Sequence, residues 1–256
     1  MQARFIRGAF GGKPFTLGKY ENTRVRVAIA ELAANGGAPM GFYTNFKDPE
    51  ARKEIVRYYQ FLAKHDALFR GSRPQHEVVL LFPRSHVHKG DVAPVEEFRR
   101  RGKEMLDQHI LFDVVPDDLL PPRFLTVVDV TKAWTKLPND LSKLGLSRFK
   151  APRTVRISVD RTAAQDALVV HCVNYARQDG APSRGKGAAD EKPLAVKEIE
   201  ADLVLPPGFR AGKVELLTPE GAPVELVATN NQGWLRFRVP EFLVYAVVRV
   251  ELVAQK

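Results

Sequence analysis

The alternation of hydrophobic and polar positions is most regular in the C-terminal part of the chain, between residues 151 and 256. In the stretch VVRVEL, Val248, Val250 and Leu252 share one face, and charged residues occupy the other. The stretch WLRFRV alternates in the same way and places Trp234 on the polar face with two arginines. A period of two with turn residues at regular intervals is typical of antiparallel strands. We therefore predict an antiparallel β-sandwich, with strands in TVRISV, ALVVHCVNY, AVKEIEADLVLP, KVELLTP, VELVAT, WLRFRVP and LVYAVVRVEL.

The N-terminal part instead shows helical periodicity between short apolar runs. The stretch RVRVAIAELAAN has Val25, Ile29 and Leu32 on one face, and the glycine pair that follows ends the predicted helix. Pro49 begins a second helix, which is expected to run to about Phe69. The apolar stretches PFTLGKY and GFYTN precede the two helices and are read as strands. The order strand, helix, strand, helix indicates an α/β unit.

The middle part repeats this order with longer strands. EVVLLFP is a nearly continuous apolar run, as expected for a strand that is buried on both faces. PVEEFRRRGKEMLDQHIL is read as an amphipathic helix, and FDVVPDD and FLTVVDV are read as further strands, which predicts a small parallel sheet. The expected fold class is α/β plus all-β, and we divide the chain into residues 1–71, 72–150 and 151–256.

Composition places broad limits on the kind of protein. The chain has 256 residues, of which 45% are hydrophobic and 27% charged, so it is able to bury a core. No apolar run approaches the roughly 20 residues that a membrane span needs, and we expect no membrane partner. The first ten residues, MQARFIRGAF, lack the apolar segment of a signal peptide, so none is expected.

Positive charge exceeds negative charge, with a formal net charge of +9. The one dense basic cluster comprises residues 99–101 and Lys103, at helical spacing from Glu96, Glu97 and Glu104. Charges of both signs at this spacing favour a solvated helix face, and we therefore expect no nucleic-acid partner. A basic nucleic-acid binder is the weakest alternative, and it would bind DNA with a steep dependence on salt.

Motifs for cofactors and metals are not found in the sequence. The Gly-Lys-Gly at residues 185–187 lacks the Lys-Ser/Thr pair of a phosphate-binding loop, and no cofactor is expected. His86 and His88 would supply two metal ligands, fewer than the three protein ligands of a catalytic zinc site, so no metal is expected. The single cysteine, Cys172, lies in an apolar run and is predicted to be a small buried residue.

Among the carboxylates, Glu21 directly follows the predicted strand PFTLGKY. Catalytic carboxylates of α/β barrels occupy the carboxyl ends of strands, so Glu21 is the candidate catalytic residue. Glycosidases need a second carboxyl group at a defined distance. Glu31 lies within a predicted helix and is expected to be structural or exposed. Asp117 and Asp118 also follow a strand, but we read them as a solvated loop pair.

These stretches together resemble a known family. Residues 12–22 (GKPFTLGKYEN) and 26–43 (RVAIAELAANGGAPMGFY) resemble the end of a (β/α)8 glycoside hydrolase barrel. YYQFLAKHDALF followed by EVVLLFPRS resembles the passage from the barrel into the trimerisation domain of family 42-like β-galactosidases. That domain is similar in fold to class I glutamine amidotransferases but lacks their chemistry. LVVHCVNY and VPEFLVYAVVRVEL resemble the terminal β-sandwich of the same enzymes.

The resemblance implies the C-terminal accessory part of a glycoside hydrolase. It implies a barrel remnant, a flavodoxin-like or amidotransferase-like domain that mediates homo-oligomerisation, and a sandwich, with carbohydrate as the partner. A whole barrel needs about 250 residues, so only its last strands and helices have a counterpart here. The position of Glu21 is near that of a nucleophile, whereas the family's acid/base carboxylate has no counterpart. The chain alone is expected to be inactive.

An alternative function needs no catalysis. The chain would then be a glycan-binding or assembly protein, in which an exposed aromatic residue such as Trp234 stacks on a sugar ring. A surface tryptophan that only covers a sheet edge is the simpler interpretation of the same residue.

Overall fold

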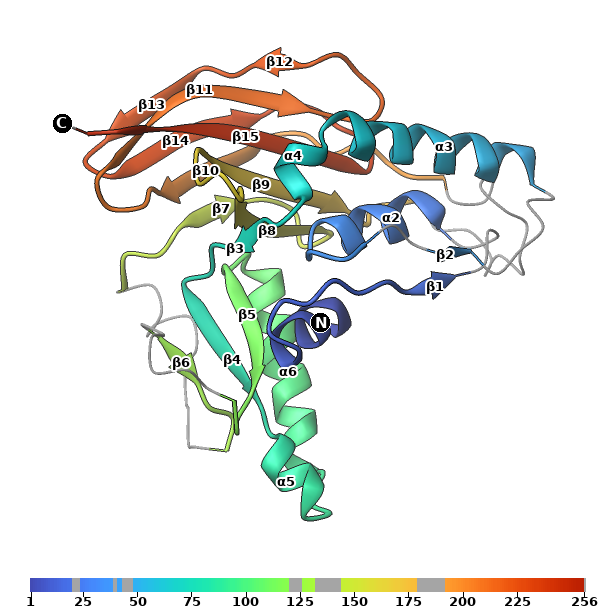
Figure 1. Cartoon of the computed structure of the whole chain (residues 1–256), viewed down its shortest axis with the longest axis vertical. Coiled ribbons are helices and arrows are strands. Elements are labelled where there is room, and N and C mark those ends of the chain that lie inside the picture. Colours follow the sequence, from blue (N-terminus) through green and yellow to red (C-terminus); the bar gives the residue numbers. More distant parts are fainter. Residues whose placement is uncertain are drawn as a thin grey trace.

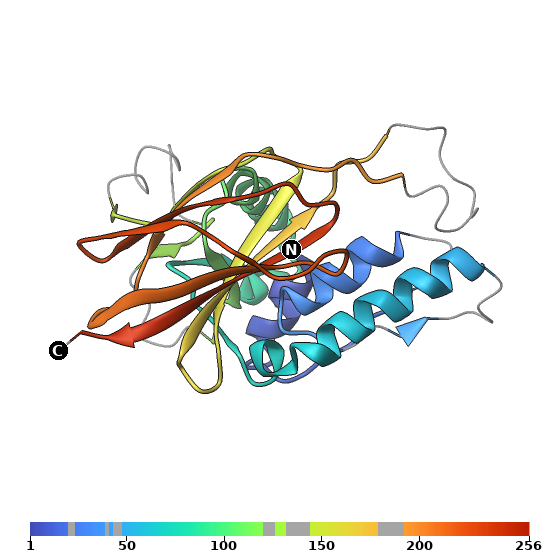
Figure 2. The same cartoon turned by 90° about the horizontal axis from the view of Figure 1, so that it is seen from above.

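The computed structural model describes residues 1–19, 24–38, 41–42, 48–119, 126–131, 144–178 and 192–255. Most of the described chain forms three layers: a pair of helices, a six-stranded sheet and a four-stranded sheet (Figures 1 and 2). A small three-stranded parallel sheet with its own helices adjoins these layers at the edge of the six-stranded sheet (Figure 1). The fold class is therefore mixed α/β with a sandwich of antiparallel sheets, as predicted.

The sandwich core lies between the two antiparallel sheets. The six-stranded sheet has the order β12-β11-β15-β9-β8-β3, and the four-stranded sheet has the order β13-β14-β10-β7. The strands of the larger sheet are β3 (Arg73–Pro74), β8 (Val155–Arg161), β9 (Ala167–Asn174), β11 (Phe209–Leu217), β12 (Val224–Glu225) and β15 (Tyr245–Ala254). Those of the smaller sheet are β7 (Arg148–Lys150), β10 (Ile199–Val204), β13 (Ala228–Asn231) and β14 (Trp234–Val239).

The central strand β9 is buried along its whole length although its sheet is antiparallel. Leu168, Val170 and Cys172 face the sandwich core, and Val169 and Val173 pack against the helical layer. Burial on both faces explains why this strand reads as a continuous apolar run rather than as an alternating one. It also confirms that Cys172 is a small buried residue, and burial raises the pKa of its thiol to about 12.

The helical layer comes from the N-terminal part of the chain. Strands β1 (Gly18–Lys19) and β2 (Gly41–Phe42) are parallel and flank helix α2 (Val25–Ala33), which forms the predicted β-α-β unit. Helix α3 (Pro49–Lys64) begins at Pro49, and the Asp48 carboxylate caps it by accepting hydrogen bonds from the backbone N–H groups of residues 50 and 51. The predicted single helix to residue 69 is interrupted at His65, after which α4 (Asp66–Phe69) forms one more turn.

The parallel sheet has the order β5-β4-β6, with β4 (Val78–Phe82) central, β5 (Phe112–Pro116) and β6 (Val127–Val128). Helix α6 (Ala93–Asp107) makes the predicted crossover from β4 to β5, and the short α5 (Arg84–His88) precedes it. Helix α1 (Gln2–Ala9), which the hydrophobic pattern did not predict, packs against β5. Its Arg4 guanidinium donates a 2.9 Å hydrogen bond to the Ile157 carbonyl in the six-stranded sheet.

Two segments connect the predicted regions to the sandwich. Residues 148–150, assigned from the sequence to the middle part, form β7 and pair with β10 of the sandwich. Most of residues 177–193 lie outside the described residues, and the two ends of this stretch form a single antiparallel bridge between Arg177 and Pro193. Within the described residues, no helix is both long enough and apolar enough to cross a membrane.

Candidate functional site

The carboxylates that the sequence singled out do not form a common site. Glu21 lies outside the described residues, so the structure does not test it as a catalytic residue. The Glu31 carboxylate accepts a hydrogen bond from the Tyr175 hydroxyl and thereby ties α2 to the chain that follows β9. Burial, reinforced by the nearby Glu31 carboxylate, raises the pKa of Tyr175 far above its ordinary value. Glu31 is thus structural, as expected.

The acidic pair after β5 also has internal partners. The Asp118 carboxylate accepts hydrogen bonds of 2.9 and 3.0 Å from Nε of Arg84, which lowers the pKa of Asp118. Asp117 accepts hydrogen bonds from the backbone N–H (3.0 Å) and the hydroxyl of Ser85. Both carboxylates therefore hold the start of α5 against the end of the parallel sheet, and the pair remains in a loop in which Asp118 is exposed and Asp117 half-buried.

The histidine pair and the basic cluster make ordinary surface contacts. Nδ1 of His86 lies 3.0 Å from the Asp91 carboxylate. No group of three metal-binding side chains is found in the part of the chain that the structure describes. Arg99 pairs with Glu96 at 2.8 Å, and Arg100 pairs with Glu97 at 2.6 Å, which is the mixed-charge helix face that the spacing predicts.

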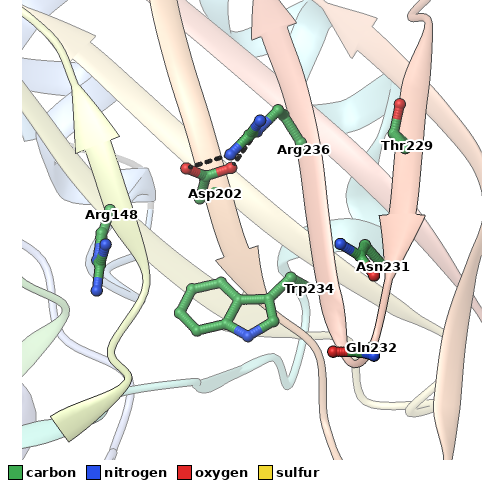
Figure 3. A pocket seen from close by; sticks show the side chains of 7 residues that line it. All are labelled: Arg148, Asp202, Thr229, Asn231, Gln232, Trp234 and Arg236. Carbon is green, nitrogen blue, oxygen red and sulfur yellow. Dashed lines mark hydrogen bonds and ion pairs between the residues drawn. The ribbon is translucent and has the colours of Figure 1, made fainter.

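The arrangement that best fits a ligand lies on the outer face of the four-stranded sheet. Here a depression of about 280 Å³ surrounds the indole of Trp234, which is half-buried. Figure 3 shows the indole extending from β14 across β10 toward β7, the strand that carries Arg148. The residues that line the depression are Arg148, Asp202, Thr229, Asn231, Gln232, Trp234 and Arg236.

Local sequence explains why Trp234 faces outward. Leu235, Phe237 and Val239 are buried in the sandwich core, so the alternate residues of β14 must point away from it, as the sequence pattern predicts. Gln232 and Gly233 connect β13 to β14 with positive φ angles of 45° and 83°. Two consecutive positive φ angles are typical of a type I′ turn, whose twist matches that of a two-residue hairpin. This turn holds the start of β14, and with it the indole, at the rim of the face.

Strand register brings charged side chains into rows beside the indole. Arg236 of β14 lies opposite Asp202 of β10, and Asp202 lies opposite Arg148 of β7. Nε of Arg236 donates to the Asp202 carboxylate at 2.6 Å, and this hydrogen bond raises the pKa of Arg236 (Figure 3). The next row repeats the order of charges, with Arg238, Glu200 and Lys150.

Several polar groups on this face have no internal partner. The side chains of Arg148, Asn231 and Gln232 make no hydrogen bond or ion pair with another residue that the structure describes. An aromatic ring beside free amide and guanidinium groups presents an apolar platform with polar groups at its edge. Pyranose sugars have the complementary form, with an apolar C–H face and hydroxyl groups around the ring.

Comparisons with known proteins support a related fold. No protein-family model and no curated protein matches the chain. Among solved structures, α-L-fucosidase isoenzyme 2 from Paenibacillus thiaminolyticus superposes with a TM-score of 0.68 at 12% sequence identity, covering 99% of this chain and 62% of that chain. A rhamnosidase from Novosphingobium sp. PP1Y superposes with a TM-score of 0.53 at 11% identity, covering 98% of this chain and 32% of that chain.

The chain therefore spans less than two thirds of the enzymes it is similar to. At these identities the similarity establishes the fold alone. The predicted resemblance to glycoside hydrolases is thus confirmed as a structural similarity to part of such enzymes, whereas the specific likeness to family 42-like β-galactosidases stays a prediction.

Proposed function

We propose that this chain is the accessory part of a glycoside hydrolase and that it binds carbohydrate on the outer face of the four-stranded sheet. The observation that carries this proposal is the half-buried indole of Trp234, beside which the polar side chains of Arg148, Asn231 and Gln232 have no partner among the described residues. The structural similarity to a fucosidase over 99% of the chain supports the same class of ligand.

The proposal also assigns a separate role to each of three parts of the chain. We assign residues 1–71 to the end of a (β/α)8 barrel, since β1, α2, β2 and α3 follow one another as a barrel's last strands and helices do. Most of residues 72–150 would form an α/β domain that mediates homo-oligomerisation, and residues 151–256 would form the accessory sandwich together with β3 and β7. Glu21 remains the candidate nucleophile. The chain alone is proposed to be catalytically inactive because it offers no assigned acid/base partner for Glu21.

Calorimetric titration with galactose-containing oligosaccharides tests the binding proposal. We expect the wild-type chain to bind, and Trp234→Ala to lose about 1.5 kcal/mol of binding free energy, or roughly tenfold in affinity, because the stacking surface is removed. Phe10→Ala is the matched control, since Phe10 is also an aromatic residue, 59% exposed, but lies at the end of α1. Equal affinities for wild type and Trp234→Ala would refute this face as the binding site.

A non-enzymatic glycan-binding protein is the second candidate, and the same face of the sheet favours it. The two candidates differ in whether the chain works as part of a longer enzyme, and they agree on the role of Trp234.

A further inference from the structure

Arg148 differs from the other cations on the outer face of the four-stranded sheet. It is exposed, and it makes no ion pair with any residue that the structure describes. By contrast, Arg236 pairs with Asp202 at 2.6 Å, Arg238 with Glu200 at 3.3 Å, and Lys150 with Glu200 at 3.9 Å. Of the four basic side chains in the two rows, Arg148 is therefore the one whose charge is left for a ligand.

The position of Arg148 places this charge beside the aromatic platform. Arg148 and Trp234 line the same depression, and Figure 3 shows the indole extending from β14 toward the strand that carries Arg148. Phe149, the next residue, is buried in the sandwich core, which fixes Arg148 on the outer face. A sugar ring stacked on the indole would thus have a guanidinium group at its edge.

The charge of the two rows favours an anionic ligand over a neutral one. Arg148, Lys150, Arg236 and Arg238 face only two carboxylates, Glu200 and Asp202. The planar guanidinium group of arginine matches the two oxygens of a carboxylate, with which it forms paired, charge-assisted hydrogen bonds.

Building on the proposed carbohydrate-binding function, we propose that the ligand at Trp234 is an acidic glycan containing a uronic acid. The pyranose ring of the uronate stacks on the indole, and its carboxylate pairs with Arg148. The Asp202–Arg236 ion pair and the amide of Gln232 offer acceptors and donors to the ring hydroxyls.

The test compares an α-1,4-linked galacturonic acid trisaccharide with the neutral α-1,4-linked galactose trisaccharide by calorimetry at neutral pH. We expect the acidic sugar to bind about fivefold more tightly than the neutral one, as for a single exposed ion pair with good geometry. Arg148→Gln should abolish this preference by weakening the binding of the acidic sugar about fivefold more than that of the neutral sugar. Raising the salt concentration should lower the affinity for the acidic sugar and not that for the neutral sugar, because salt screens exposed charges.

Lys150→Gln is the matched control. It removes one positive charge from the same face of the same strand, one row away from the depression, and should keep the preference for the acidic sugar. Equal loss of preference in Lys150→Gln and Arg148→Gln would overturn the role of Arg148 and indicate general attraction to a basic surface.

Two further outcomes separate this inference from the function on which it rests. Equal binding of both sugars, abolished by Trp234→Ala, would refute the acidic ligand while upholding carbohydrate binding on this face. Failure of both sugars to bind the wild-type chain would refute both proposals for these glycans.

Discussion

At the scale of single residues, polar side chains are buried where the helices meet the six-stranded sheet. His171 of β9 is fully buried, and its Nδ1 lies 2.8 Å from the hydroxyl of Tyr245 on the neighbouring strand. Its Nε2 lies 3.8 Å from the Asp160 carboxylate. Burial, aided by the nearby Arg7 guanidinium, lowers the pKa of His171 to about 3, so the folded protein holds a neutral imidazole.

This neutral imidazole makes stability depend on pH. An unfolded histidine takes up a proton below about pH 6.5, whereas His171 in the folded protein does not, so stability is lost as the pH falls through that value. At pH 5 the loss from this residue is about 2 kcal/mol. We expect the free energy of unfolding of His171→Gln, measured with urea at pH 7.5 and pH 5, to fall less than that of the wild type.

Asp160 has the opposite effect on the pH dependence of stability. Burial raises the pKa of its carboxyl group, so this residue contributes more stability as the pH falls. It is present in both proteins, so the comparison of His171→Gln with the wild type isolates the histidine. Identical losses of stability in the two proteins would show that His171 is protonated in the folded state or does not titrate in this range.

At the scale of elements, helix α1 is placed by close contact of backbones. Gly8 lies where α1 meets β5, and a Cβ atom there would overlap the carbonyl oxygen of Val114. Gly102 in α6 is also a helical glycine with a close neighbour, but that neighbour is the end of the Met1 side chain, which is able to move. The first glycine is therefore required by packing and the second is not.

The two glycines give a matched pair of substitutions. Alanine in a helix is more stable than glycine by about 1 kcal/mol when nothing opposes it. We expect Gly8→Ala nevertheless to lower the free energy of unfolding by about 2 kcal/mol, because α1 must move away from β5. Gly102→Ala should change it by less than about 1 kcal/mol in either direction. Urea denaturation followed by circular dichroism measures both, and a Gly8→Ala variant as stable as Gly102→Ala would contradict the close packing of α1.

At the scale of the whole molecule, one buried arginine joins three parts of the chain. Arg7 of α1 lies 3.4 Å from the Asp113 carboxylate in the parallel sheet and 3.5 Å from the Asp160 carboxylate in the six-stranded sheet. All three side chains are at most 6% exposed. A guanidinium group that is shared by two carboxylates requires both of them to face it, so Arg7 fixes α1 relative to both sheets.

We expect Arg7→Met to destabilise the protein by about 3 kcal/mol or more at neutral pH, because two buried carboxylates lose their partner. The defect should become smaller as the pH falls, because burial raises the pKa of the Asp160 carboxyl group, and a protonated carboxyl group needs no cationic partner. Arg238→Met is the control, since Arg238 makes an exposed ion pair with Glu200 and its loss should cost less than about 1 kcal/mol. Equal effects of the two substitutions on urea unfolding would contradict a joining role for Arg7.

Much of the architecture was predictable because it depends on local patterns. Period-two alternation identified β14 and β15 and placed Trp234 on the outer face, and helical spacing identified α2 and α6. Predictions were weaker where a segment is short or has no clear pattern, as for α1, β3 and β7. The continuous apolar run of β9 agrees with burial on both faces, but the sequence of the strand does not show that the helical layer covers the second face.

The sequence by itself determined the fold class, the inward and outward sides of β14, and the mixed-charge face of α6. Only the tertiary structure brought Arg148 and Asp202 next to Trp234, and only it gave Glu31 a partner in Tyr175. The physical reason is that alternation and helical spacing follow from the geometry of a single element, whereas neighbours across a sheet depend on which distant strands pair and in which register.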